Sequence, residues 1–152
     1  MRLIRLTKQD KARIQQILKR YLDREEVQSM HRFVQHGRTS TYAHSVNVVK
    51  LSYWLNKKFH LKADERALLT GALLHDLYDW HEKSDWHKWH GFSHPFRAAG
   101  NAHRIFHIGK RERQIIESHM WPLTLRHVPE TREAAIVCIA DKCCSFYETV
   151  RR

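Results

Sequence analysis

Apolar residues recur along this chain every three or four positions, the spacing that places them on one face of an α-helix. The first stripe runs from Ile14 to Tyr21. Thr7 followed by Asp10 forms a capping-box pattern, which predicts the start of this helix. Later stripes of the same period predict further helices over residues 40–59, 63–79, 94–106, 110–120 and 130–150.

A second helix is predicted directly after the first. Asp23 with Glu26 repeats the start signal, and the apolar positions that follow extend to Val34. Gly37 then stands where a glycine commonly ends a helix, because it adopts the left-handed conformation without strain. The chain is thus expected to open with two short helices.

One stretch interrupts the helical pattern. Residues 80–93 are rich in Trp, His and Lys and show no clean period, so we expect a loop over the functional site. Trp80, Trp86 and Trp89 of this loop either form a packing lid or stack on a nucleobase. Pro95 predicts that the next helix begins at His94-Pro95, since a proline at the first helical position loses no hydrogen bond.

The composition agrees with a helical domain. A chain of 152 residues suits one domain, and 42% hydrophobic residues exclude a disordered chain. Only 5 Gly and 3 Pro are present, too few for the many tight turns of an all-β protein. We therefore expect an all-α fold, a compact bundle of six to seven helices.

The sequence carries no sign of export or of membrane insertion. The N-terminus lacks the apolar region of a signal peptide, and no stretch approaches 18 consecutive apolar residues. Cys138, Cys143 and Cys144 are an odd set within one predicted helix, so no disulfide framework is implied. These features predict a reduced, cytoplasmic protein that has no membrane partner.

The net charge favours anionic partners. Lys and Arg number 27 against 16 Asp and Glu, which gives a formal net charge of +11. Such a balance attracts phosphates, nucleic acids and small anionic substrates. The basic residues are scattered, with no run of five, so the simplest interpretation is a solvated surface that favours anions.

Several polar residues occupy positions that face the predicted core. His44 lies on the apolar row of its helix, His75 and Asp76 follow an apolar run, and His119 continues another apolar row. Asp141 lies on the apolar stripe of the last helix. A carboxylate directed into a core is unfavourable unless it is paired or binds a metal ion.

Two interpretations of these residues compete. Imidazole and carboxylate groups from separate helices form metal sites in helical bundles, and this donor set suits Fe, Mn or Zn. Alternatively, each is a buried residue with an ordinary partner, such as a backbone carbonyl for His44 or a salt bridge for Asp141. For the whole set, metal binding is the stronger interpretation.

The order of these residues resembles that of a known family. His44, then His75-Asp76, then Asp141, each on its own predicted helix, is similar to the HD-domain superfamily of metal-dependent phosphohydrolases. The resemblance also extends to the local contexts Tyr42-Ala43-His44-Ser45, Leu73-Leu74-His75-Asp76 and Ile139-Ala140-Asp141-Lys142. It implies that these histidines and aspartates hold a metal ion, and that residues 1–36 are accessory helices before an HD core at 37–150.

Two further segments resemble HD proteins that hold two metal ions. One is His94-Pro95 followed by Gly100, and the other is the stretch 116–120 around His119. The resemblance implies that Asp76 bridges to a second ion held by His94 and His119. An alternative for His94 is a helix N-cap, since it directly precedes a proline.

The chain also departs from one branch of this superfamily. The HD-GYP cyclic-dinucleotide phosphodiesterases carry Gly-Tyr-Pro after their second histidine segment, whereas this chain has Trp121-Pro122-Leu123 after Met120. Those enzymes also have a lysine three residues after the His-Asp pair, where this chain has Asp79. The resemblance is closest to small stand-alone bacterial HD proteins.

The resemblance implies hydrolysis of a phosphate ester by a metal-activated water. Asp76 and Asp79 are the acidic candidates for catalysis, with Asp79 orienting a ligand or acting as a general base. Arg38 and Arg97 are candidates for neutralising charge on the phosphoryl group. The alternatives are that Asp79 only ends its helix and that both arginines are surface residues.

Three functions remain after this reasoning. The first is a phosphomonoesterase or phosphodiesterase with one or two divalent ions and a small phosphorylated substrate, nucleotides being among the candidates. The second is a non-catalytic basic module that binds nucleic acid or nucleotides. The third is a degenerate HD protein that senses a nucleotide without hydrolysing it. The sequence leaves the oligomeric state open.

Overall fold

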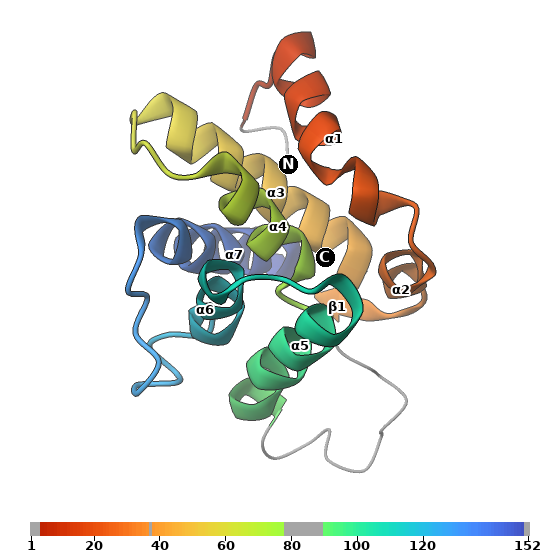
Figure 1. Cartoon of the computed structure of the whole chain (residues 1–152), viewed down its shortest axis with the longest axis vertical. Helices are drawn as coiled ribbons and strands as arrows, with labels where there is room; N and C mark the ends of the chain where they lie inside the picture. Colours follow the sequence, from red (N-terminus) through yellow and green to blue (C-terminus); the bar gives the residue numbers. More distant parts are fainter. Residues whose placement is uncertain (1–3, 37, 78–89, 151–152) are drawn as a thin grey trace.

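The computed structural model describes residues 4–36, 38–77 and 90–150. The chain is 72% helical, with seven α-helices and one two-stranded antiparallel sheet among these residues. The prediction of an all-α bundle is therefore confirmed (Figure 1). None of the helices in the described residues is both long enough and apolar enough to cross a membrane.

Helix α4 (Glu65–Leu74) lies at the centre of the bundle. Every residue from Ala67 to Leu74 is buried, because this run is apolar on all sides apart from Thr70. The helix packs against α3 (Thr41–Lys58), α6 (Lys110–Ser118) and α7 (Arg132–Val150) (Figure 1). The residues that directly follow α4, His75 and Asp76, therefore lie in the interior of the molecule.

A glycine permits the close approach of α4 and α6. A Cβ atom at Gly71 would lie 2.6 Å from Cγ2 of Ile115, far inside van der Waals contact. Glycine in a helix interior costs about 1 kcal/mol relative to alanine, so its presence reflects this contact.

Helix α1 (Lys8–Leu22) begins as predicted. The Thr7 hydroxyl accepts a hydrogen bond from the Asp10 N–H at 3.1 Å, and the Asp10 carboxylate accepts one from the Thr7 N–H at 2.9 Å. Asp10 is buried and also pairs with Lys57 of α3, which ties α1 to the bundle.

The second predicted helix is wrong beyond residue 32. A short α2 (Glu25–Gln28) passes into a 3₁₀ turn, η1 (Ser29–Arg32), and the strands β1 (Val34–His36) and β2 (Thr39–Ser40) follow. Phe33 is extended, at φ −116° and ψ 136°, and its carbonyl accepts a hydrogen bond from the Thr41 N–H at 2.8 Å. Val34 pairs with Ser40 and is 60% exposed, so it lies on no buried helical face. Gly37 lies outside the described residues.

Helix α5 (His90–Phe106) begins earlier than predicted, and Pro95 lies inside it. The prediction that the helix starts at His94-Pro95 is therefore wrong, and residues 90–93 are helical. A proline here removes only the bond to the carbonyl of residue 91, and so close to the helix start this loss is tolerated. The rest of the predicted loop, with Trp80, Trp86 and Trp89, lies outside the described residues.

Of the remaining helices, α3, α6 and α7 match their predicted ranges closely, whereas α4 is shorter than predicted. Ser40 caps α3 by accepting a hydrogen bond from the Ala43 N–H, so His44 falls in the first turn of that helix. Helix α4 ends at Leu74, five residues before the predicted end at Asp79, which is outside the described residues. Helices α6 and α7 each end or begin within two residues of the predicted limits.

Candidate metal centre

Six histidine and aspartate side chains from five parts of the bundle meet in its interior. Helix α3 supplies one, the segment after α4 two, α5 one, the end of α6 one and α7 one. All of them are buried, with at most 6% of their surface exposed. They are His44, His75, Asp76, His94, His119 and Asp141. These are the six metal ligands that the sequence and its resemblance predicted.

One group of donors gathers around Asp141. Its Oδ1 lies 3.0 Å from Nε2 of His44 and 3.6 Å from Nε2 of His75. One donor atom from each of these three residues lies within 4.8 Å of the other two. This group can hold a metal ion.

A second group gathers on the other side of Asp76. His94 and His119 direct their Nε2 atoms toward Oδ1 of Asp76, at 3.4 and 3.7 Å, and these two nitrogens lie 3.0 Å apart. Donor atoms of His75, Asp76 and His119 also lie within 4.8 Å of one another. The alternative of His94 as a helix cap is wrong, because α5 begins four residues earlier.

Three of the histidines are anchored through Nδ1. His75 contacts the carbonyl of Ala72 at 2.8 Å, and His119 contacts the carbonyl of Ile116 at 2.6 Å. Nδ1 of His44 lies 2.8 Å from Oε2 of a carboxylate, Glu148. Carbonyl and carboxylate oxygens only accept hydrogen bonds, so each of these Nδ1 atoms carries a proton. Each Nε2 is then aimed at the centre of the cluster, as in histidines that bind metal ions.

Charges within the first group oppose the effect of burial. Burial disfavours the charged ring of His44, but hydrogen bonds to Asp141 and Glu148 raise its pKa to about 9. For His75 burial is likewise outweighed, and Asp76 and Asp141 raise its pKa well above the ordinary value. Burial raises the pKa values of both aspartates, but His75 and His94 for Asp76, and His44 and His75 for Asp141, hold them well below their usual range. Both carboxylates are therefore ionised at neutral pH.

His119 differs from the histidines of the first group. Burial, together with the nearby rings of His75 and His94, lowers the pKa of His119 to about 3. Its ring is neutral at physiological pH, and a neutral ring is the form that binds a metal ion.

The cluster passes a test of fit to a divalent cation. Nε2 of His75 is buried and lies 3.1 Å from Oδ2 of Asp76 and 3.6 Å from Oδ1 of Asp141, yet neither contact has the geometry of a hydrogen bond. A cation between these atoms would satisfy all three of them. Nitrogen and carboxylate oxygen donors together suit Fe, Mn and Zn better than Ca or Mg. The groups present therefore fit a divalent transition-metal ion.

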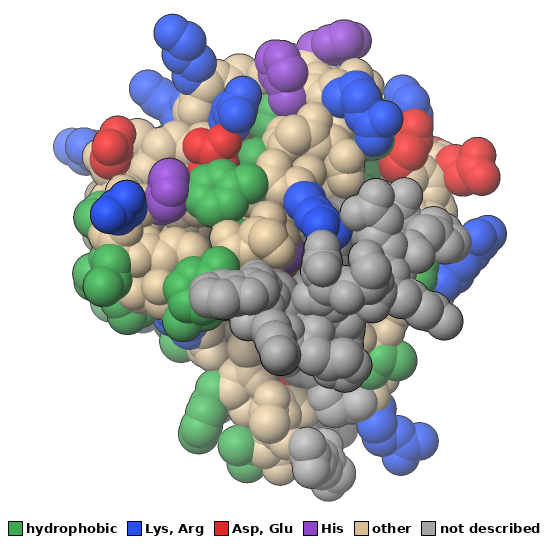
Figure 2. All heavy atoms as spheres, turned by 90° about the horizontal axis from the view of Figure 1, so that it is seen from below, with side chains coloured by type: hydrophobic (Ala, Val, Ile, Leu, Met, Phe, Trp, Pro, Cys, Tyr) green, Lys and Arg blue, Asp and Glu red, His purple; other side chains and the backbone are tan. Residues whose placement is uncertain are grey.

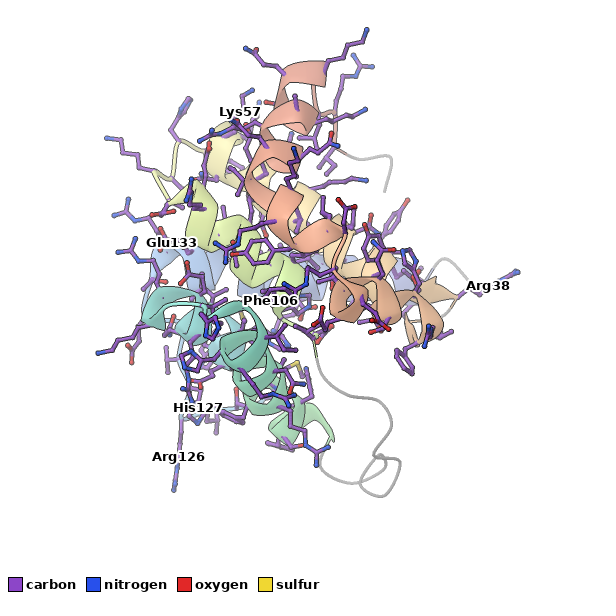
Figure 3. The ribbon with its side chains drawn as sticks, turned by 45° about the vertical axis from the view of Figure 1, so that its right-hand side comes forward. Arg38, Lys57, Phe106, Arg126, His127 and Glu133 are labelled. Atoms are coloured by element: carbon purple, nitrogen blue, oxygen red, sulfur yellow. The ribbon has the colours of Figure 1, made fainter. Side chains whose placement is uncertain are left out.

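The structure does not bring every candidate residue to this cluster. Arg38 is exposed in the turn between β1 and β2, and Figure 3 shows its side chain directed outward. Arg97 is partly buried and lies three residues after His94 on α5, which places both on one side of that helix. Asp79 lies outside the described residues, so its role stays a prediction.

Sequence reasoning missed Glu148, which is 8% exposed. Its Oε1 accepts a hydrogen bond from Nδ2 of Asn47 at 2.8 Å, while Oε2 faces His44. The sequence contained a signal for it, since Glu148 lies seven residues, or two helical turns, after Asp141 and therefore on the same face of the helix. Lys142 was also overlooked as a contact, and its Nζ donates to the His119 carbonyl at 2.8 Å.

Comparison with known proteins agrees with this geometry. The family model described as HD domain matches residues 41–145, a span from the start of α3 into α7 that contains all six clustered residues. Searches of curated proteins and of solved structures gave no match. Because the match covers well over half of the chain, this protein belongs to the HD domain family.

Proposed function

We propose that this protein is a phosphohydrolase that uses two divalent metal ions to cleave a phosphate ester of a small molecule. HD domain proteins are generally metal-dependent hydrolases. The observation that carries the proposal is the position of Asp76. Its Oδ2 lies 3.1 Å from His75 and 3.8 Å from His44, whereas its Oδ1 faces His94 and His119.

This division of oxygens is what a carboxylate needs to bridge two ions. In the proposal, Asp76 would be a ligand of both ions. His44, His75 and Asp141 complete the first site, and His94 and His119 complete the second. The ions are Fe, Mn or Zn by the chemistry of these donors.

A pair of such ions supplies a hydroxide nucleophile at neutral pH and neutralises charge on the phosphoryl oxygens. The protein's own residues orient the ligands. The Nδ1 contacts of His75 and His119 fix the rotation of each ring, and burial on five elements excludes bulk water. Arg97 is the candidate for binding the phosphate, since it follows His94 by less than one helical turn.

The alternative of a basic binding module has less support. Figure 2 shows Lys and Arg around much of the outline of one face, without a single patch among the coloured side chains. A cleft of about 980 Å³ between α1 and the starts of α4 and α6 is lined by both signs of charge, including the ion pair of Arg13 with Glu65 at 2.9 Å. Neither feature selects an anion.

Metal content tests the proposal. The protein purified without chelators should contain up to two equivalents of Fe, Mn or Zn by elemental analysis. Replacement of Asp76 by Ala should remove both ions, because it takes a ligand from each site. The exposed Asp23, at the end of α1, provides the control Asp23→Ala, which should retain them.

Hydrolysis is the second measurement. The loaded protein should release phosphate or a phosphomonoester from some member of a panel of nucleotides and other phosphate esters, and Asp76→Ala should not. Full metal content in Asp76→Ala would contradict the assignment of the ligands. A wild-type protein that binds no ion after reconstitution, and whose affinity for nucleic acid falls steeply with salt, would favour the binding module.

A further inference from the structure

The histidine on α3 differs from two other histidines of the cluster in how its ring is held. His75 and His119 each follow the last turn of a helix and contact the carbonyl three residues earlier. The last carbonyls of a helix lack intrahelical partners, so these acceptors are available locally. His44 lies in the first turn of α3, where the neighbouring carbonyls accept the helix's own hydrogen bonds.

An acceptor for His44 must therefore come from another element, and α7 supplies it. Oε2 of Glu148 lies 2.8 Å from Nδ1 of His44, a contact between residues 104 positions apart. Both side chains are buried, with 0% and 8% of the residue surface exposed. We propose, on the basis of the function proposed above, that Glu148 is a positioning residue of the metal centre, which fixes the tautomer of His44 and strengthens Nε2 as a ligand.

Glu148 is itself held in place by α3. Its second oxygen accepts a hydrogen bond from Nδ2 of Asn47 at 2.8 Å, and Asn47 lies three residues after His44 on the same side of the helix. Each carboxylate oxygen thus contacts a side chain of α3. This arrangement prevents the carboxylate from rotating away when His44 binds an ion.

A carboxylate does more here than a carbonyl does for His75 and His119. It accepts a hydrogen bond from Nδ1–H, so the lone pair of the neutral ring is on Nε2, and its negative charge increases electron density on the ring. His44 therefore provides a stronger donor than a histidine bound only to a carbonyl. Loss of such a partner typically weakens metal binding by about 10- to 100-fold.

The matched control lies on the same helix. Glu133 is also a buried glutamate of α7, with 4% of its surface exposed, and its Oε1 accepts a hydrogen bond from the Asp64 N–H at 2.7 Å. Figure 3 labels it close to α4. The variant E133Q therefore reports the cost of neutralising a buried glutamate of this helix away from the cluster.

The experiment measures the affinity of E148A, E148Q, E133Q and wild type for Zn²⁺ and for Mn²⁺ by competition with a chelator. We expect E148A to lose about 10- to 100-fold in affinity, and E148Q, whose amide oxygen still accepts a hydrogen bond from Nδ1–H, to lose less. E133Q should match wild type. In thermal unfolding of the metal-free proteins, E148Q and E133Q should show a similar fall in Tm relative to wild type. This comparison separates the effect on metal binding from an effect on folding.

The tautomer provides a readout that a structural role would not change. In the Zn²⁺-loaded wild type, nitrogen NMR of the imidazole rings should show His44 protonated at Nδ1, and E148A should lose the slow exchange of that proton. Wild-type affinity in both Glu148 variants, or a His44 protonated at Nε2, would overturn the inference. A protein that shows the expected loss of affinity but hydrolyses no ester would instead contradict only the proposed function.

Discussion

Asp141 is the ligand candidate on the longest helix, and it contacts two histidines of the first group. Its conservative variant, Asp141→Asn, keeps the size of the side chain and removes the charge. A metal ion typically contributes several kcal/mol to phosphoryl transfer, so hydrolysis should fall by roughly 100- to 1000-fold. Initial rates with any active substrate, measured beside metal content, check this.

A control for Asp141→Asn lies two residues away. Cys143 is exposed on the outer side of α7, and Cys143→Ser should leave both metal content and rate unchanged. Unchanged hydrolysis in Asp141→Asn would show that Asp141 is only a buried partner of His44. The alternative to metal binding, in which Asp141 forms only a salt bridge, would then be the correct interpretation.

At the scale of single residues, helical periodicity identified His44, His119 and Asp141 as inward-facing polar residues, and the family resemblance added His94; neither identified the residues that hold these side chains in place. Asp141 stood out because a carboxylate occupied an apolar stripe, and the structure buries it there at 6% exposure. Glu148 lies two turns after Asp141 on the same helix, but its partner His44 is 104 positions away in the sequence. Only the packing of α7 on α3 shows that Glu148 meets His44.

His119 directly follows helix α6, and the distance between α6 and α4 depends on Gly71. In Gly71→Ala the new methyl group would meet the side chain of Ile115 at 2.6 Å, and Ile115 is fully buried. Overpacking of this kind costs about 1–3 kcal/mol, partly offset by the better helix propensity of alanine. We expect a net loss of about 1–2 kcal/mol in urea unfolding, and weaker metal binding because α6 is displaced.

The chain offers a matched test of this packing. A Cβ atom at Gly100 of α5 would meet nothing within 4 Å, so Gly100→Ala should stabilise the protein by up to about 1 kcal/mol through helix propensity alone. Equal stability changes in the two variants would show that the α4–α6 contact tolerates a methyl group and that Gly71 is not required for it.

Helix α1 is joined to the bundle by a contact whose strength depends on pH. A hydrogen bond from Lys57 outweighs burial and lowers the pKa of Asp10 from 3.8 to about 2. A group whose pKa is lower in the folded state stabilises the protein above its unfolded pKa and loses that effect as pH falls. The contribution of Asp10 should therefore be complete above about pH 4 and disappear toward about pH 2.

The variant Asp10→Asn isolates this effect. Urea unfolding should show it to be less stable than wild type at pH 5, with the difference shrinking as the pH is lowered toward 2. Other carboxylates titrate in both proteins and cancel in the comparison. A difference that stayed constant over this range would mean that the Asp10 charge contributes nothing, and that only its cap on Thr7 stabilises α1.

At the scale of elements, the errors of the sequence-based prediction lie where local signals conflict with tertiary contacts. The apolar positions up to Val34 have helical spacing, but the hydrogen bond from Thr41 to the Phe33 carbonyl turns the chain into a hairpin. Pro95 indicated a helix start, although the structure extends α5 to His90. Neither a distant hydrogen bond nor a tolerated proline is visible in a window of sequence.

The buried cluster of histidines and aspartates connects most of the molecule, because its side chains come from α3, α5 and α7 and from the ends of α4 and α6. Without an ion, each of these elements presents charged or polar groups to the others in the interior. Binding of a ligand to the folded state alone adds about 2.7 kcal/mol at a concentration 100 times its dissociation constant. For a chain of this size that corresponds to a rise of roughly 5–10 °C in Tm.

The comparison is between chelator-treated protein and the same protein with the ion restored, followed by circular dichroism on heating. The Tm of the wild type should rise by this amount when the ion is restored. The Tm of Asp76→Ala should rise little, because this variant lacks a proposed ligand at both sites. The control matters since the chain has 13 histidines, of which four belong to the cluster. If Asp76→Ala gained as much as wild type, the ion would be stabilising the fold through other histidines, and the buried cluster would not be the site that it occupies.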